Sequence, residues 1–214
     1  MIFRQPNKEH GIGLVIDWKF YKGNKWVSTF APHLVQAIIK EFNPVIINSQ
    51  HKYQWHRKKI KCIISMEPGW AAPKLTYDKH PGQLILVLAS DPHNKTAWFQ
   101  DYVIDNDIDF ILSQYYNPFF YHFPDFPTER FVHFPWAVPD QYLSSNEIIH
   151  RTDEVVIFGG QHSDAYDIRN WCRKQQGIKS FSFSGCEDKR LSDAEYYIWL
   201  TQFDAIVAAG SSLP

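Results

Sequence analysis

Short apolar runs that alternate with helix-like segments are the feature that most constrains the fold of this chain. In the first part of the sequence these runs cover residues 12–16, 44–48, 60–65, 84–89, 109–113 and 131–134. The run at 84–89 is apolar throughout, which is typical of a parallel strand buried on both faces. Residues 30–42 and 93–105 have apolar side chains at helical spacing. The alternation predicts an α/β fold with a Rossmann-like, doubly wound parallel sheet.

A proline-punctuated stretch interrupts this alternation and predicts a domain boundary. The segment Phe134-Pro135-Trp136-Ala137-Val138-Pro139 cannot continue a helix, and the residues after it are polar. Strands and helices are then predicted in turn at 155–158, 164–176, 179–183, 192–200 and 203–208. We therefore predict an N-terminal domain at 1–135, a linker at 136–153 and a second domain at 154–214. A β-α-β-α-β order is half of a doubly wound domain, so we expect the second domain to be incomplete.

Composition and charge exclude several classes of function. Lys plus Arg is 22 and Asp plus Glu is 23, so no global positive field draws the chain onto nucleic acid or anionic lipid. The basic, aromatic segment at 51–59 therefore predicts an exposed loop rather than a nucleic-acid patch. No apolar run approaches the roughly 20 residues of a membrane-spanning helix, and the N-terminus lacks a signal-peptide stretch. We expect a cytoplasmic protein with no transmembrane segment.

The candidate metal ligands lack the spacing that metal sites need. Cys62, Cys172 and Cys186 form no Cys-x-x-Cys pair, and the ten histidines form neither His-x-x-x-His nor His-Glu-x-x-His. The Asp-x-Asp pattern within 105–109 falls between a predicted helix end and a strand start, where a solvated loop is expected. We therefore predict reduced cysteines and no bound metal.

Polar and aromatic residues follow the predicted strands of the first domain. Ligands of open α/β sheets bind beyond the carboxyl ends of the strands. Residues predicted at these ends, and so expected to bind the substrate, are Asp17, Trp18, Glu67, Gln114 and Trp136. The two tryptophans offer rings for stacking, with core packing as the alternative. Asp17 and Glu67 can instead be turn or cap residues.

Asp91 and His93 follow the most apolar run and are the candidate catalytic residues. A histidine at a strand end suits a general base for a hydroxyl group, because its pKa lies near neutrality. The alternative is that Asp91 caps the following helix and His93 lies on the surface.

The second domain opens with a strand that leads through Gly159 and Gly160 towards a helix. Glycines allow the backbone to approach a phosphate, and a helix N-terminus offers free N–H groups. His162 lies in this segment, and Arg169 lies farther into the helix, where it suits a charge-assisted contact to a diphosphate. A plain tight turn with a solvated arginine is the alternative. Small polar residues also follow the next two strands, at Ser184, Gly185, Ser211 and Ser212.

Several of these segments together resemble the two-domain GT-B glycosyltransferases, most closely the group-1 and spore-coat-type members. The segments are 109–114, 131–139, and 155–160 with Ala165-Tyr166-Asp167-Ile168-Arg169. The helix, strand and small-residue loop from Glu195 to Ser212 are similar to later elements of the same family. The resemblance covers roughly residues 85–214, whereas residues 1–80 share only the topology and a Gly11-x-Gly13 pattern.

The resemblance implies transfer of a sugar from a nucleotide-diphosphate donor to an acceptor hydroxyl, on a glycan or another molecule, without an obligatory metal or cofactor. Backbone amides, helix dipoles and basic side chains stabilise the leaving diphosphate in such a reaction. The residues that this implies for the diphosphate are Gly159, Gly160, His162 and Arg169. Ser184 and Gly185 would lie near the base or ribose, and Ser211 and Ser212 near the donor phosphates or sugar. Asp91 and His93 would face the acceptor.

The sequence departs from the family pattern at one point, and this departure leaves several hypotheses open. Family members carry a glutamate-bearing helix beyond the position of Ser211 and Ser212, and the sequence ends before it. We therefore expect a truncated donor domain that can support self-association. The alternatives are an inactive carbohydrate- or nucleotide-binding module, a different two-domain α/β enzyme such as a sugar-nucleotide epimerase, and a periplasmic-type binding protein.

Overall fold

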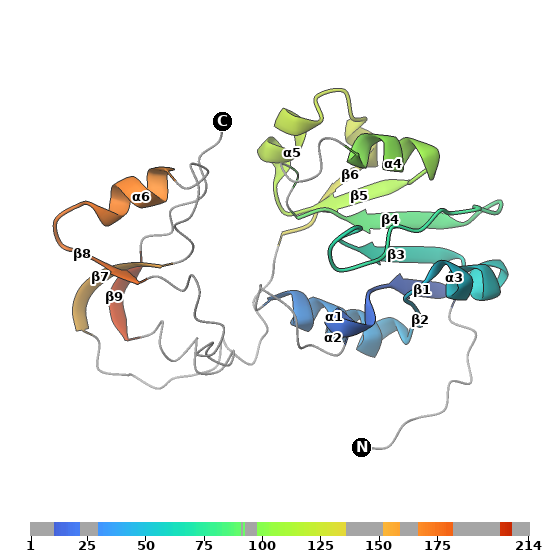
Figure 1. The fold of residues 1–214 in the computed structure, drawn as a ribbon, viewed down its shortest axis with the longest axis horizontal. Coiled ribbons are helices and arrows are strands. Elements are labelled where there is room, and N and C mark those ends of the chain that lie inside the picture. The colour runs from blue at the N-terminus through green and yellow to red at the C-terminus, as the bar shows by residue number, and fades with distance from the viewer. Residues whose placement is uncertain are drawn as a thin grey trace, which may run out of the picture. The chain divides into compact units, whose positions relative to one another are not determined.

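The computed structural model describes residues 11–21, 30–90, 92, 98–135, 152–158, 167–181 and 202–206 of the 214-residue chain (Figure 1). The chain divides into two compact units, Met1–Val138 and Pro139–Pro214. Each unit has its own parallel sheet.

The first unit is built on a six-stranded parallel sheet with the order β2-β1-β3-β4-β5-β6. Its strands are β1 (Ile12–Val15), β2 (Val45–Ile47), β3 (Cys62–Met66), β4 (Leu84–Leu88), β5 (Phe110–Ser113) and β6 (Phe131–His133). Each strand overlaps one of the apolar runs, so the prediction of a parallel α/β fold is confirmed. The arrangement is Rossmann-like.

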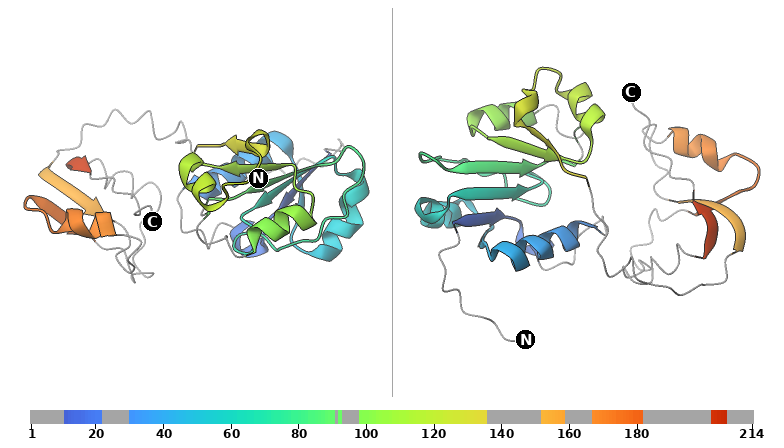
Figure 2. Two further views of the ribbon diagram at one scale, coloured as in Figure 1. Left: turned by 90° about the horizontal axis from the view of Figure 1, so that it is seen from above. Right: turned by 180° about the vertical axis from the view of Figure 1, so that it is seen from behind.

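Helices lie on both sides of this sheet (Figure 2). They are α1 (Trp18–Tyr21), α2 (Phe30–Phe42), α3 (Gln50–His56), α4 (Phe99–Asp105) and α5 (Tyr116–His122). Crossovers between parallel strands are right-handed, and the chain reverses its direction across the sheet after β2. The helices before and after this reversal therefore belong to opposite faces, α2 to one and α3, α4 and α5 to the other.

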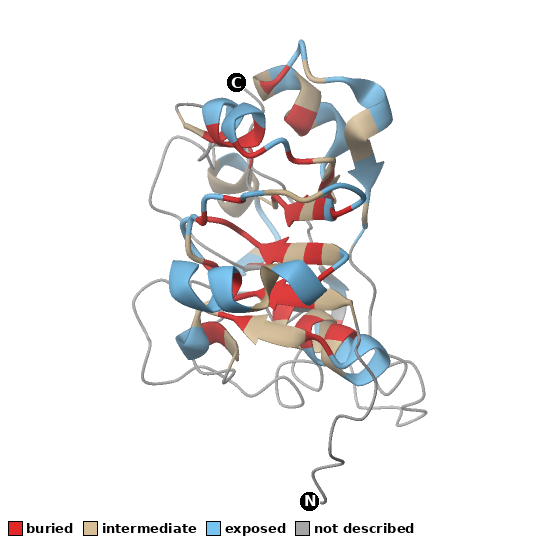
Figure 3. Ribbon diagram, turned by 90° about the vertical axis from the view of Figure 1, so that its right-hand side faces the viewer, coloured by how far each residue is buried: buried red, intermediate tan, exposed pale blue. Residues whose placement is uncertain are grey.

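Buried residues alternate with less buried ones along β3, β4 and β5, so the two faces of the sheet are buried to different extents (Figure 3). The face beneath α3, α4 and α5 is fully buried at the centre, with 0% exposure at Ile63, Ser65, Ile85, Val87, Ile111 and Ser113. On the other face, Leu84 and Val132 remain 45% and 38% exposed. The prediction that 84–89 is buried on both faces therefore fails at the start of β4, because α2 lies at the β1–β2 end of the sheet.

A cluster of phenylalanines fixes α5 and the chain after it to the sheet. Phe119 is fully buried and its ring centroid lies 4.8 Å from Phe131 on β6 and 5.0 Å from Phe123. Phe126 meets Phe119 edge to face at 5.3 Å. A 3₁₀ turn, η3 (Thr128–Arg130), then leads directly into β6.

An extended segment, and not a helix, joins β3 to β4; we refer to residues 73–80 as the β3–β4 strap. The Gln50 side chain donates to the carbonyl of Thr76 at 2.7 Å and accepts from its amide at 2.9 Å. The amide of Tyr77 donates to Asn106 Oδ1 at 2.7 Å, where the side chain of Asn106 is buried. The side chains of Gln50 on α3 and Asn106 after α4 thus make the hydrogen bonds that the strap's backbone groups would make with one another in a helix.

The strap also uses the acidic residues near the start of β5. Lys79 Nζ donates to Asp109 Oδ1 at 2.7 Å and to Asp107 Oδ2 at 3.0 Å. Burial lowers the pKa of Lys79, but the hydrogen bonds to the two carboxylates outweigh it, so the pKa is raised overall. The two aspartates of the Asp-x-Asp pattern therefore bind the Lys79 side chain, whereas a solvated loop was expected there.

The segment at 51–59 is helical, so the prediction of a loop is wrong there, whereas the predicted exposure holds for most of its residues. Residues Gln50–His56 form α3, and Arg57–Lys59 form the 3₁₀ turn η1. Ser49 caps α3, because its Oγ accepts the amide of Lys52 at 3.3 Å. Tyr53 is fully buried, and its hydroxyl donates to the carbonyl of Asp78 at 3.1 Å.

Within the described residues, the second unit has a three-stranded parallel sheet with the order β8-β7-β9. These strands are β7 (Thr152–Phe158), β8 (Ile178–Phe181) and β9 (Phe203–Ile206). One helix, α6 (Asp167–Arg173), connects β7 to β8, and the turn after it contains Gly177 at φ 84°. The helix predicted at 192–200 lies outside the described residues.

Candidate functional site

The strand order of the first unit creates a switch point at β1 and β3. The chain runs from β1 to β2 on one side and returns to β3 on the other. In open α/β sheets the crevice for a ligand forms beyond the carboxyl ends of the two strands where the direction changes. The segments that follow these strands carry Asp17, Trp18, Glu67 and Trp70, which we call the switch-point residues.

Backbone hydrogen bonds join the two segments directly. The amide of Asp17, just past β1, donates to the carbonyl of Ala71 at 2.7 Å. The carbonyl of Glu67 accepts the amides of Trp70 and Ala71 at 3.0 and 2.9 Å. Glu67 has φ 42° and Gly69 has φ 83°, so the chain turns sharply as it leaves β3. This turn places Trp70 beside the segment that carries Trp18.

Trp18 and Trp70 are both 43% exposed, although each also packs against the protein. Trp18 stacks on Tyr21 at 5.0 Å with an interplanar angle of 22°. Trp70 meets Phe20 at 5.1 Å. Each indole is thus held by a neighbouring ring and keeps part of its own ring open to solvent, where a sugar or a base can stack.

The charges around these tryptophans nearly balance. Asp17 Oδ1 accepts the amide of Lys19 at 3.0 Å, and the two side chains form an exposed ion pair at 3.7 Å. Lys52 Nζ lies 5.9 Å from the centroid of the Trp18 ring. A surface of stacking rings with one carboxylate and two amines suits a polar ligand of low charge.

Glu67 is only 2% exposed, so its carboxylate is buried at the end of β3. Its Oε1 accepts the amide of Ser90 at 2.5 Å, which links the end of β3 to the end of β4. Pro92 is buried just after this link. The predicted catalytic residues Asp91 and His93 flank Pro92 and lie outside the described residues. The hydrogen bond from Ser90 to Glu67 fixes the backbone at the end of β4.

Gln114 follows β5, which is separated from β3 by β4. With about 4.8 Å between neighbouring strands, Gln114 belongs to a position roughly 10 Å along the edge from Glu67. Its carbonyl lies 3.1 Å from His133 Nε2. The exposed rings of Tyr115 and Tyr116 come next in the chain. Asp17, Trp18 and Glu67 are thus brought together, whereas Gln114 belongs to a neighbouring part of the same edge.

Trp70 is the residue that the sequence reasoning missed. After β3 the residue predicted at the strand end was Glu67 alone, and Trp70 comes three residues later. The signal that was present is Gly69-Trp70, a turn glycine followed by an indole immediately beyond a strand. Such a pair marks an aromatic side chain presented by a turn at the edge of a sheet.

Most of the predicted donor residues lie outside the described part of the chain, as does the predicted substrate residue Trp136. The donor residues in question are Gly159, Gly160, His162, Ser184, Gly185, Ser211 and Ser212. Arg169 is described, and it lies half-buried on α6. Burial, together with the positive charge of Arg169, lowers the pKa of Arg173 one helical turn later. The second unit therefore concentrates positive charge on this helix.

The described residues contain no group of three or more His, Cys, Asp or Glu side chains that is arranged to hold a metal ion. Cys62 and Cys172 are free thiols. Burial, and then the charge of Asp109, raises the pKa of Cys62, which keeps this thiol protonated at neutral pH.

No helix among the described residues is long and apolar enough to span a membrane. The resemblance stated above rests on the sequence pattern alone. No family model matches the chain, and it matches no curated protein and no solved structure.

Proposed function

We propose that this chain binds a carbohydrate at the switch-point residues and transfers a sugar from a nucleotide-diphosphate donor to a hydroxyl group of that carbohydrate. The observation that carries the proposal is the pair of half-exposed tryptophans, Trp18 and Trp70, at the carboxyl ends of β1 and β3. The C–H face of a sugar ring packs on an indole, and its hydroxyls then reach the polar atoms of Asp17 and Lys19.

The proposal of sugar transfer is supported by other observations than the proposal of carbohydrate binding. It rests on the GT-B-like sequence pattern and on the second parallel α/β unit, in which β7 is followed by Gly159 and Gly160 and then by α6. In the proposed reaction His93 takes the proton from the acceptor hydroxyl as the general base, and Asp91 is the second candidate catalytic residue. The glycine amides and the guanidinium of Arg169 stabilise the charge that develops on the leaving diphosphate.

The binding part is tested with the whole chain and a panel of neutral di- and trisaccharides, followed by tryptophan fluorescence. We expect Trp18→Ala and Trp70→Ala each to weaken binding of the best saccharide at least about tenfold, which corresponds to about 1.4 kcal/mol. Trp55→Ala is the matched control, because Trp55 lies on α3 with 77% exposure and outside the switch-point residues. If Trp18→Ala and Trp70→Ala bound the saccharide as tightly as Trp55→Ala and the parent chain do, carbohydrate binding at this edge would be overturned.

The transfer part is tested by thermal-shift measurements with UDP, GDP, ADP, CMP and their sugar conjugates, with and without Mg²⁺. We expect one diphosphate to raise the melting temperature without metal, because a ligand that binds the folded state stabilises it. Arg169→Ala should abolish that shift. Release of the nucleotide diphosphate on addition of the saccharide would then demonstrate transfer. Saccharide binding without any nucleotide effect would limit the function to carbohydrate binding.

A further inference from the structure

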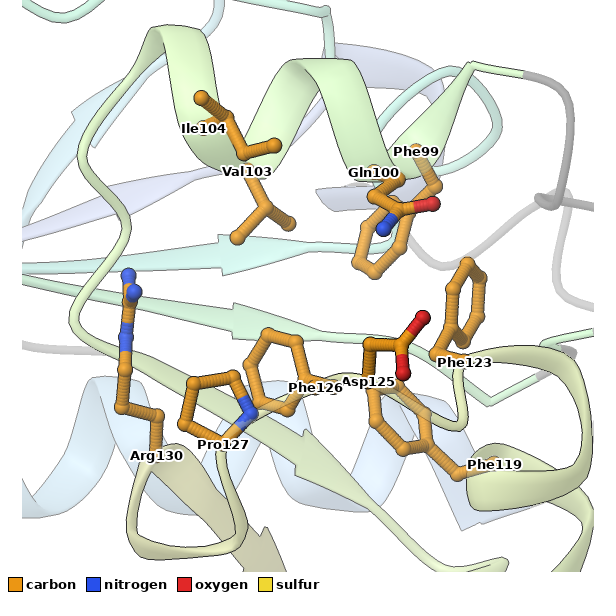
Figure 4. Close-up of a pocket in the computed structure, with 10 residues that line it drawn as sticks. All are labelled: Phe99, Gln100, Val103, Ile104, Phe119, Phe123, Asp125, Phe126, Pro127 and Arg130. Atoms are coloured by element: carbon orange, nitrogen blue, oxygen red, sulfur yellow. The ribbon is translucent and has the colours of Figure 1, made fainter.

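A cavity of the first unit lies away from the strand ends. It is a cavity of about 230 Å³ between α4 and the segment that runs from α5 to η3 (Figure 4). None of the switch-point residues lines it. The phenylalanines that line it are Phe99, Phe119, Phe123 and Phe126. Ile104, at its edge on α4, is 68% exposed, so the cavity opens to solvent.

The size of the cavity limits what it can hold. A closed apolar cavity of about 150 Å³ accepts a benzene molecule, and sites for drug-sized ligands begin at about 300 Å³. A volume of about 230 Å³ therefore suits one ring, or a chain of similar size, with a short substituent. The aromatic walls are held in place by their mutual contacts, with Phe99 and Phe123 at 5.6 Å and Phe119 and Phe126 at 5.3 Å.

The charged groups that line the cavity are not equivalent. The guanidinium of Arg130 is engaged by backbone carbonyls, since its Nε donates to Asp109 at 3.3 Å and its Nη2 donates to Ile108. Asp125, in contrast, is exposed and forms no ion pair or hydrogen bond with the described residues. Its carboxylate points towards the side of the cavity where Gln100 and Phe99 lie (Figure 4). This end of the cavity therefore combines aromatic rings with a carboxylate that forms no ion pair with Arg130.

We propose that this cavity binds a small organic cation, an ammonium group carried on an aromatic ring or a short apolar chain. The apolar part would fill the space between the phenylalanines, where burial of its surface supplies the binding energy. The ammonium group would lie at the Asp125 end, where it pairs with the carboxylate and with the faces of neighbouring rings. The proposal does not depend on the proposed sugar transfer, because the two sites share no residue.

The experiment compares two probes of the same shape and opposite charge, 2-phenylethylammonium and 3-phenylpropionate. Binding to the full chain is followed by protein-observed NMR at physiological salt. We expect the ammonium probe to bind at least about tenfold more tightly than the carboxylate probe, with shifts at the amides of Gln100 and Phe126. The absence of binding by the ammonium probe up to 5 mM, or equal binding of both probes, would overturn the proposal.

Three variants test whether Asp125 causes the preference for the ammonium probe and whether both probes bind in the cavity. Asp125→Asn should reduce the preference for the ammonium probe to about twofold or less, and it leaves the fold intact because Asp125 is exposed. Asp101→Asn removes an exposed carboxylate from α4, the helix on the other side of the cavity, at a position outside the cavity lining, and should leave the preference unchanged. Ile104→Trp places a larger side chain at the open edge and should weaken both probes. A preference that persists in Asp125→Asn would show that this carboxylate does not select the ligand.

Discussion

Replacement of Asn106 by alanine tests how the β3–β4 strap is held. The side chain of Asn106 is 6% exposed and makes two hydrogen bonds, accepting from the amide of Tyr77 at 2.7 Å and donating to the carbonyl of Tyr102 at 2.9 Å. In Asn106→Ala the Tyr77 amide stays buried without its acceptor. Tyr102 keeps a partner, because its carbonyl also accepts the backbone amide of residue 106 at 3.2 Å.

The expected loss of stability follows from this difference between the Tyr77 amide, which loses its partner, and the Tyr102 carbonyl, which keeps one. A buried amide that loses its acceptor costs about 1–3 kcal/mol, and the second bond contributes about 1 kcal/mol net. We therefore expect Asn106→Ala to lower the free energy of unfolding by about 2–4 kcal/mol, a large share of the stability of an ordinary domain. Urea denaturation followed by tryptophan fluorescence measures this loss, provided that the m-value is unchanged.

Gln54→Ala is the control for that measurement. Gln54 is an exposed residue on α3, and its replacement should change the stability by no more than about 0.5 kcal/mol. A loss below about 1 kcal/mol in Asn106→Ala, or a loss equal to that of the control, would refute the reasoning. It would mean that the strap does not depend on this side chain for its backbone hydrogen bonds.

Three further predictions concern packing, charge and capping. Phe119→Ala should cost about 3–5 kcal/mol in the same urea assay, because it empties the centre of the phenylalanine cluster; a cost below 1.5 kcal/mol would contradict that role. The pKa of Lys79 is raised, so its stabilising effect is present below the unfolded pKa near 10.5 and is lost as the pH rises above it. Stability measured between pH 9 and 12 should therefore fall less steeply in Lys79→Met than in the parent chain. Ser49→Ala removes the cap of α3 and should cost about 1 kcal/mol, whereas Ser49→Asp should retain the cap.

The strands were predictable because their signal is local. A short, fully apolar run such as 84–88 indicates a strand without knowledge of its neighbours, and α2 was predicted over its full length from its apolar spacing. Helix α3 was not predicted, because the signal for it is not local. In this helix one buried residue, Tyr53, supplies the contact with the strap, and the surrounding sequence is polar and basic. Its stability comes from tertiary contacts that no local pattern contains.

The candidate site was predictable only in part. The rule of strand ends identified Asp17, Trp18 and Glu67, and the strand order then placed them on neighbouring strands. The sequence does not reveal that order, because any pair of parallel strands can in principle be neighbours. It also does not reveal that the Glu67 side chain is buried and bonded to the β4 end, or that the turn after it presents Trp70.

The β3–β4 strap also has a consequence for the order of events in folding. A crossover helix closes hydrogen bonds between residues four apart. The backbone groups of Thr76 and Tyr77 in the strap instead depend on Gln50 and Asn106, which are 26 and 29 residues away, on α3 and just beyond α4. Such long loops must close before the strap can be held, so it should form late. In the native state, release of α3 exposes the amide of Thr76, and release of the α4 end exposes that of Tyr77. Hydrogen exchange at these two adjacent amides should therefore report separately on the opening of two helices that are far apart in the sequence.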